Sequence, residues 1–296
     1  MKPGELDVPV AGGTLRLCRW PGGTGPTVLA AHGITANALS WAPVADALAG
    51  RATLIAADLR GRARSAALPG PYGLAQHADD LIAVLDHLGL ERAPVVGHSM
   101  GAFVAAVAAL RHPDRVSSVL LVDGGVTLQV PEAANIDDVL EAVIGPAMRR
   151  LQMTFDSERA YLEFWRAHPA LSAHWSPAVR DYALRDLVGE PPALRSSCAL
   201  EAVRRDATDT LLDEQTTTAA QWIRCPATLL WCERGILDEP QGLYDEARLT
   251  AAGVDPDRLT TTMVSDVNHY TILLSAKGAA TVAEHIARAA CGPVAA

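Results

Sequence analysis

The chain has 296 residues, 49% of them apolar and 20% charged, so one large domain, or one domain with an insertion, is expected. Its formal net charge of −9 excludes the positive surface that binding to nucleic acid or to an anionic membrane requires. Five scattered cysteines and the lack of GxGxxG and HExxH motifs predict no cofactor and no metal. The sequence shows no signal-peptide pattern and no long apolar run, which favours a cytoplasmic protein.

The first half of the chain alternates between strand and helix patterns. Residues 5–20 predict a hairpin around the turn Ala11-Gly12-Gly13, and the unbroken apolar runs at 27–31 and 53–57 are typical of parallel strands buried on both faces. Further strands are expected at 93–99, 116–125, 226–232 and 259–264, with helices at 41–50, 75–90, 100–113 and 276–290. This order predicts an α/β fold with a doubly wound, mostly parallel eight-stranded sheet.

Residues 127–222 interrupt the alternation after the sixth strand. They offer only helical patterns, at about 136–152, 157–168, 177–188 and 196–213, and no convincing strand. We therefore expect a core domain of residues 1–126 and 223–296 and a helical insertion of residues 127–222. The insertion holds seven of the fourteen aromatic residues, which favours an apolar or aromatic ligand.

The sharpest motif is Gly97-His98-Ser99-Met100-Gly101, which lies between an apolar strand and a helix. GxSxG in this context is typical of a nucleophile elbow, a strained turn that lifts the serine oxygen clear of the sheet. The Met100 amide at the start of the helix lacks an intrahelical acceptor and is a natural donor to an oxyanion. Ser99 is the predicted nucleophile.

A serine nucleophile needs a histidine base that a third group orients. His269 follows the last predicted strand, the place that the chain order serine, acid, histidine gives to the base. The other histidines lie in helical patterns, at helix ends or in the insertion, and His98 is expected to point away from the serine by strand alternation. His269 is the predicted base.

With these motifs the chain resembles the α/β-hydrolase superfamily over nearly its whole length. The resemblance rests on the elbow 97–101, His32-Gly33, the segment 58–65 (DLRGRARS) and Asn268-His269-Tyr270. It implies an oxyanion hole formed by the backbone amides of Ile34 and Met100, and it implies that residues 127–222 form a cap. Ala63 stands where the family usually has glycine, which affects only the local loop geometry.

The position of the acidic residue that would orient His269 departs from the usual family pattern. Gly235 occupies the position after strand 226–232 where relatives usually carry an aspartate. Asp123 ends the preceding strand, and an acid there resembles haloalkane dehalogenases and fungal zearalenone lactonases. We expect Asp123 to be the acid, with Asp238 as the alternative and Glu233 third.

The sequence thus predicts a serine hydrolase that cleaves a small apolar ester or lactone through an acyl-enzyme, with a zearalenone-type macrolactone as the specific hypothesis. His174 and Trp175, in the loop-like stretch SAHWSP, are the predicted substrate-binding residues. A C–C bond hydrolase of ring-cleavage diketones and a non-catalytic ligand receptor are the alternatives. Serine at position 99 excludes a dehalogenase. The sequence does not determine the oligomeric state, and a homo-oligomer is possible.

Overall fold

An eight-stranded sheet forms the centre of the computed structural model, which describes the chain except residues 128–134, 136–137, 139–144, 146 and 292–296. The strand order is β1-β2-β4-β3-β5-β6-β9-β10. β2 runs antiparallel to β1 and β4, and the other neighbours are parallel. The strands are β1 (Gly4–Val10), β2 (Gly13–Trp20), β3 (Thr27–Ala31), β4 (Thr53–Ala57), β5 (Ala93–His98), β6 (Val116–Val122), β9 (Ala227–Cys232) and β10 (Leu259–Val264).

Alternation along the strands gives the sheet two apolar faces. In β4, Leu54 and Ala56 are buried in one hydrophobic cluster, and Ile55 and Ala57 in another. The central strands are thus covered on both sides, which explains their unbroken apolar sequences. The predicted fold class is therefore correct.

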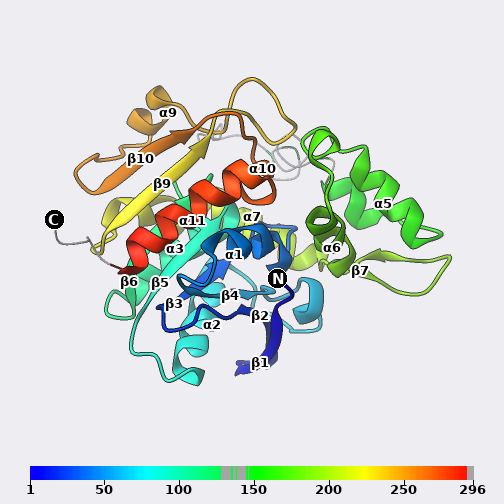
Figure 1. The fold of residues 1–296 in the computed structure, drawn as a ribbon, viewed down its shortest axis with the longest axis horizontal. Helices are drawn as coiled ribbons and strands as arrows, with labels where there is room; N and C mark the ends of the chain where they lie inside the picture. The colour runs from blue at the N-terminus through cyan, green and yellow to red at the C-terminus, as the bar shows by residue number, and fades with distance from the viewer. Residues whose placement is uncertain (128–134, 136–137, 139–144, 146, 292–296) are drawn as a thin grey trace.

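Helices fill the two sides of the sheet. On one side α1 packs on α11, which lie side by side in front of the sheet in Figure 1, and α2 packs on α3 on the other side. The helices of this part are α1 (Ala42–Leu48), α2 (Leu74–His87), α3 (Met100–Arg111), α9 (Glu246–Ala251), α10 (Thr271–Leu274) and α11 (Ala276–Cys291), with 3-10 turns η1 (Ala38–Trp41) and η2 (Ala63–Ser65).

The segment between β6 and β9 is mostly helical, and Figure 1 shows its helices α5 and α6 beyond one end of the sheet. It contains α5 (Glu158–Arg166), η3 (Ser172–His174), α6 (Pro177–Arg185), α7 (Leu200–Leu212), α8 (Glu214–Thr218) and η4 (Ala219–Trp222). Of the predicted helix 136–152, residues 138, 145 and 147–152 are described and are helical, and the others lie outside the described residues.

The prediction of no strand in this segment is wrong. β7 (Leu187–Val188) and β8 (Arg195–Ser196) form a two-stranded antiparallel sheet, and Phe155 bridges to Leu194. Strands of two residues are too short to show the alternation from which strands are predicted.

None of the helices that the structure describes has both the length and the hydropathy needed to cross a membrane.

Candidate active site

The turn between β5 and α3 holds Ser99 in a strained conformation. Its φ is +56°, in the region that favours glycine, and its amide donates to Val122 O at 2.9 Å, which fixes the turn to β6. A Cβ on Gly97 would lie 1.9 Å from Gly101 O, so only glycine allows this close approach of strand and helix. The sequence around Ser99 therefore builds the strained strand-to-helix turn that a nucleophile elbow requires.

Asp123 and His269 meet through a short hydrogen bond. His269 Nδ1 lies 2.6 Å from Asp123 Oδ2, and both side chains are buried. The other carboxylate oxygen accepts the Cys232 amide at 3.0 Å. Burial favours the neutral form of Asp123, but the hydrogen bonds from His269 and Cys232 outweigh it and lower the pKa of the carboxyl. Asp123 is therefore held as a carboxylate that orients the imidazole.

The two alternative acids lie elsewhere. Asp238 accepts from Arg234 Nε at 2.7 Å and from Asn268 Nδ2 at 3.0 Å, and the hydrogen bond from Arg234 lowers the pKa of its carboxyl. Glu233 Oε2 accepts the Asp266 amide at 2.7 Å. Among the described contacts, neither acid reaches His269.

The loop after β3 lies beside the elbow, and two buried side chains hold it there. The Leu59 amide donates to His32 Nε2 at 2.9 Å, so Nδ1 carries the proton and donates to Gly33 O at 2.7 Å. Arg62 Nε donates to Ile34 O at 3.0 Å and thereby fixes the next peptide. Ile34 and Ser99 line the same pocket, and Met100 begins α3.

The expected orientation of His98 is wrong. His98 lines the pocket with Ser99, and its ring centroid lies 4.6 Å from that of His269. His98 Nε2 donates to His269 O at 2.8 Å. Alternation fails here because the strand ends in the strained turn at Ser99, so neighbouring side chains no longer point to opposite faces.

The pocket around Ser99 has a mostly apolar lining, and its space of about 480 Å³ includes open solvent. The Ser99 hydroxyl has no hydrogen-bond partner among the described residues, and catalytic hydrogen bonds often tighten only with substrate bound. Besides the elbow and the loop after β3, the lining comprises Ser40, Tyr182, Ile236, His269, Tyr270, Leu273 and Leu274.

The two predicted substrate-binding residues do not line this pocket. His174 is exposed on the turn η3, and Trp175 packs under the Arg166 guanidinium, 4.9 Å from the ring centroid. The prediction rested on a loop-like sequence, which indicates exposure but not direction. Tyr182, on α6, is the aromatic side chain of the inserted segment that lines the pocket.

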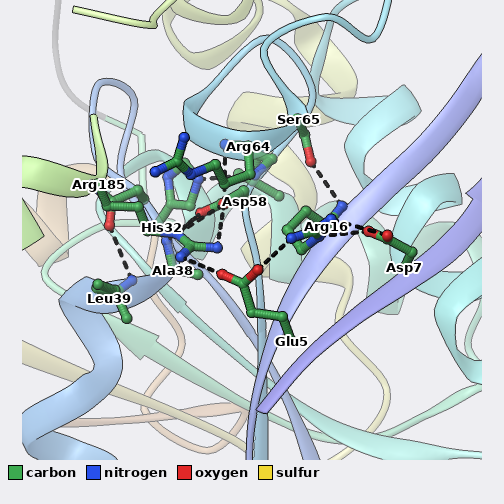
Figure 2. Close-up of polar contacts among 12 residues, drawn as sticks. Glu5, Asp7, Arg16, His32, Ala38, Leu39, Asp58, Arg64, Ser65 and Arg185 are labelled. Carbon is green, nitrogen blue, oxygen red and sulfur yellow. Dashed lines mark hydrogen bonds and ion pairs between the residues drawn. The ribbon is translucent and has the colours of Figure 1, made fainter. Parts of the chain in front are cut away.

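Two buried ion pairs and one hydrogen bond from a buried arginine join the inserted segment to the core near the pocket. Arg185 on α6 binds Asp58 with Nε–Oδ2 at 2.9 Å, and it also binds Glu5 at 2.8 Å, as Figure 2 shows. Asp206 on α7 pairs with Arg62 and lies 2.9 Å from His77 Nε2.

Arg150 forms the third contact. It pairs with Asp186 within the inserted segment and donates to Thr35 O at 3.1 Å, next to Ile34. Thr35 lines the pocket, Arg62 donates to Ile34 O and Asp58 accepts the Ala38 amide, so each contact reaches the segment from Ile34 to Ala38.

Among the residues that the structure describes, no group of three or more His, Cys, Asp or Glu side chains could hold a metal ion.

The fold and the geometry around Ser99 are those of an alpha/beta hydrolase, and a comparison with family models gives the same class. The model of the alpha/beta hydrolase fold matches residues 26–275, so the chain belongs to this family.

Curated relatives match about a third of this chain. The Caulobacter segnis protein named "Putative carbamate hydrolase RutD" is 40% identical over 107 residues, 36% of this chain and 40% of its own length. The 2-(acetamidomethylene)succinate hydrolase of Mesorhizobium japonicum is 39% identical over 101 residues, 34% of this chain and 36% of its own length. The chain thus matches well under half the length of these relatives.

A solved structure of E-2-(acetamidomethylene)succinate hydrolase shares the fold. It has a TM-score of 0.78 and 23% identity, over 96% of this chain and 97% of the other. At this identity the likeness shows the fold alone.

Proposed function

We propose that this protein hydrolyses a neutral carboxylic ester or lactone through a covalent acyl-enzyme on Ser99. The observation that carries the proposal is the 2.6 Å contact between Asp123 and His269, in the pocket that Ser99 also lines. A carboxylate, an imidazole and a serine on an elbow are the three groups that this reaction uses.

In the acylation step, His269 Nε2 takes the proton of Ser99 Oγ while the oxygen attacks the substrate carbonyl. Asp123 keeps the proton on Nδ1, so that Nε2 is the free base, and it stabilises the imidazolium that forms. The amides of Ile34 and Met100 donate to the carbonyl oxygen as it becomes negative. The imidazolium then returns the proton to the leaving alkoxide, and the acyl-enzyme remains.

In the deacylation step, His269 takes a proton from water, and the resulting nucleophile attacks the acyl carbonyl. Collapse of the tetrahedral intermediate breaks the bond to Ser99 Oγ, which regains its proton from His269. The products are a carboxylic acid and an alcohol, or one hydroxy acid when the substrate is a lactone.

The apolar lining of the pocket supports an uncharged substrate. Ile236, Tyr270, Leu273 and Leu274 offer hydrophobic contact beside the nucleophile. An apolar or aromatic ester or lactone suits these walls, and a zearalenone-type macrolactone is the specific substrate to test.

A substrate panel tests the proposal. The wild type and Ser99→Ala are compared on aryl esters, simple lactones, zearalenone, an aryl carbamate and a dienol of a ring-cleavage diketone. We expect ester or lactone turnover by the wild type, with a burst of alcohol release, and a loss of several orders of magnitude in Ser99→Ala.

Turnover of the dienol alone would replace the proposal with C–C bond hydrolysis. Cleavage of the carbamate without the esters would favour the chemistry that the name of the Caulobacter relative indicates. Ester turnover that persists in Ser99→Ala would overturn the covalent mechanism.

A further inference from the structure

Two buried polar atoms without a hydrogen-bond partner belong to residues that line the Ser99 pocket. They are Ser40 Oγ and His98 Nδ1, on side chains that are 4% and 5% exposed. Most buried polar atoms in proteins have a partner, because leaving one unpaired costs free energy. Two such atoms in one ligand pocket indicate that the ligand supplies the missing partners.

The hydrogen bond of His98 fixes what its free nitrogen can do. Nε2 lies 2.8 Å from the carbonyl oxygen of His269, and a carbonyl oxygen only accepts, so Nε2 carries the proton. Burial lowers the pKa of His98 to about 3, so the ring is neutral near neutral pH. His98 Nδ1 is therefore a bare acceptor.

The free nitrogen lies close to the nucleophile. A Cβ built on Gly33 would lie 3.5 Å from His98 Nδ1 and 3.6 Å from Ser99 Oγ. Both atoms thus border the same glycine of the pocket wall, and a substrate group near the scissile carbonyl is within reach of Nδ1.

The other residues that line the pocket restrict the charge of the substrate group that His98 Nδ1 could bind. Among the described residues of the lining there is no Asp, Glu, Lys or Arg. A carboxylate or an ammonium group would be buried there without a counter-charge, which is strongly unfavourable. A hydroxyl can donate to an acceptor such as His98 Nδ1 and accept from a donor such as the Ser40 hydroxyl, so it carries both complementary groups without charge.

We propose that Ser40 and His98 form a hydrogen-bonding subsite that recognises a neutral hydroxyl group on the substrate, close to its scissile carbonyl. The subsite rests on the proposed ester hydrolysis at Ser99, because it places the hydroxyl relative to the carbonyl that Ser99 attacks. It makes hydroxy-acid esters the preferred class of substrate.

Matched esters test the subsite. Phenyl 2-hydroxybutanoate and phenyl 3-hydroxybutanoate are each compared with phenyl butanoate, and the ratio of kcat/KM values is the readout. The wild type should prefer one hydroxy ester by about tenfold, the size expected of a hydrogen bond to a buried group. A wild-type ratio near one for both hydroxy esters would overturn the proposal.

Two variants each remove one of the two polar atoms of the subsite. Ser40→Ala deletes a hydroxyl that bonds to no described residue, so no hydrogen bond of the fold is broken. His98→Gln keeps an N–H for His269 O but has no atom in place of Nδ1. Both should bring the ratio close to one.

Ser118→Ala, which truncates a buried serine on β6 away from the pocket, is the matched control and should keep the wild-type ratio. An unchanged ratio in Ser40→Ala, with the wild-type melting temperature, would contradict the subsite even if His98→Gln fails to fold.

A binding measurement tests the subsite independently of the proposed hydrolysis. Calorimetry measures the Kd of the three intact esters with the Ser99→Ala variant, which needs no turnover. Tighter binding of a hydroxy ester that depends on Ser40 supports the subsite even if the wild type hydrolyses none of them. Equal affinities for all three esters would exclude it even if ester hydrolysis is confirmed.

Discussion

At the scale of single residues, Asp123 and Asp238 make the sharpest contrast. Asp123 contacts His269, whereas Asp238 is bound to Arg234 and Asn268. We expect Asp123→Asn to lower kcat by about 10⁴-fold, because an amide can no longer hold the imidazole in the required tautomer. The matched variant Asp238→Asn should keep kcat within a few-fold. Steady-state kinetics on one ester decides between them, and the reverse result would assign the acid to Asp238.

Ala63 offers a second test at this scale. Its φ is +43°, a conformation that costs a residue with a Cβ about 1 kcal/mol or more. Ala63→Gly should therefore raise the free energy of unfolding by about 0.5–1 kcal/mol, after the extra backbone entropy of glycine is counted.

Ala66 is the control for Ala63, because its φ of −59° is ordinary. Ala66→Gly should destabilise by about 0.5–1 kcal/mol. Urea unfolding measures both variants, and destabilisation by Ala63→Gly would show that the strain is not relieved.

The positions of Ser99 and Asp123 could be predicted because each directly follows a strand with a clear pattern, and that of His269 because it lies in the loop after the last strand, β10. The positions of Ser40 and Tyr182 could not. They reach the pocket from η1 and from α6, and no local motif marks them. His98 was misplaced because alternation holds along a strand but not at its strained end.

At the scale of elements, two carboxylates of α7 join this helix to the backbone amides at the start of α2. Asp206 Oδ1 accepts the Gly73 amide at 2.7 Å and Asp209 Oδ2 accepts the Leu74 amide at 3.2 Å. These amides have no acceptor within α2, so α7 caps another helix.

The Asp206 carboxylate is expected to contribute strongly to stability. Burial opposes its charge, but His77 and Arg62 lower its pKa to about 2. Asp206→Asn should cost about 3 kcal/mol at pH 7, because Arg62 is left buried without its counter-charge. Urea unfolding of the wild type and the variant measures the difference.

The pH dependence of that difference follows from the lowered pKa. The contribution of a carboxylate whose folded pKa lies below its unfolded pKa is complete above the unfolded value and is lost as the pH falls through the folded value. The difference between wild type and Asp206→Asn should thus be constant from pH 7 to about 5 and about 1 kcal/mol smaller at pH 3. A difference that grows on acidification would contradict the assignment.

Long elements were predictable and short ones were not. The strands of the main sheet lie within a few residues of their predicted bounds, because five or more residues suffice to show an apolar run or alternation. The two-residue strands β7 and β8 and the four-residue helix α10 are too short for either pattern. α10 matters for function, since it brings Leu273 and Leu274 to the pocket.

At the scale of the whole molecule, buried charges connect segments that are far apart in the sequence. Arg185 and Asp58 are 127 residues apart, and Arg150 and Thr35 are 115 apart. Composition shows the arginines and the aspartate only as charges, and a single sequence does not indicate what each of them contacts.

Because of these contacts, we expect the inserted segment and the core to unfold together. Tryptophans report on both parts, with Trp20 and Trp41 buried in the core and Trp165 buried on α5. Urea transitions followed by tryptophan fluorescence and by far-ultraviolet circular dichroism should coincide. Two separated transitions would mean that the ionic contacts do not couple the parts.

The central claim is that Ser99 is the nucleophile of a covalent hydrolase. A fluorophosphonate reacts with a serine that a histidine activates, so intact-protein mass spectrometry tests the claim directly. The account predicts a single adduct on the wild type, located on the peptide that contains Ser99, and no adduct on Ser99→Ala. An unlabelled wild type, or an equal adduct on both proteins, would contradict it.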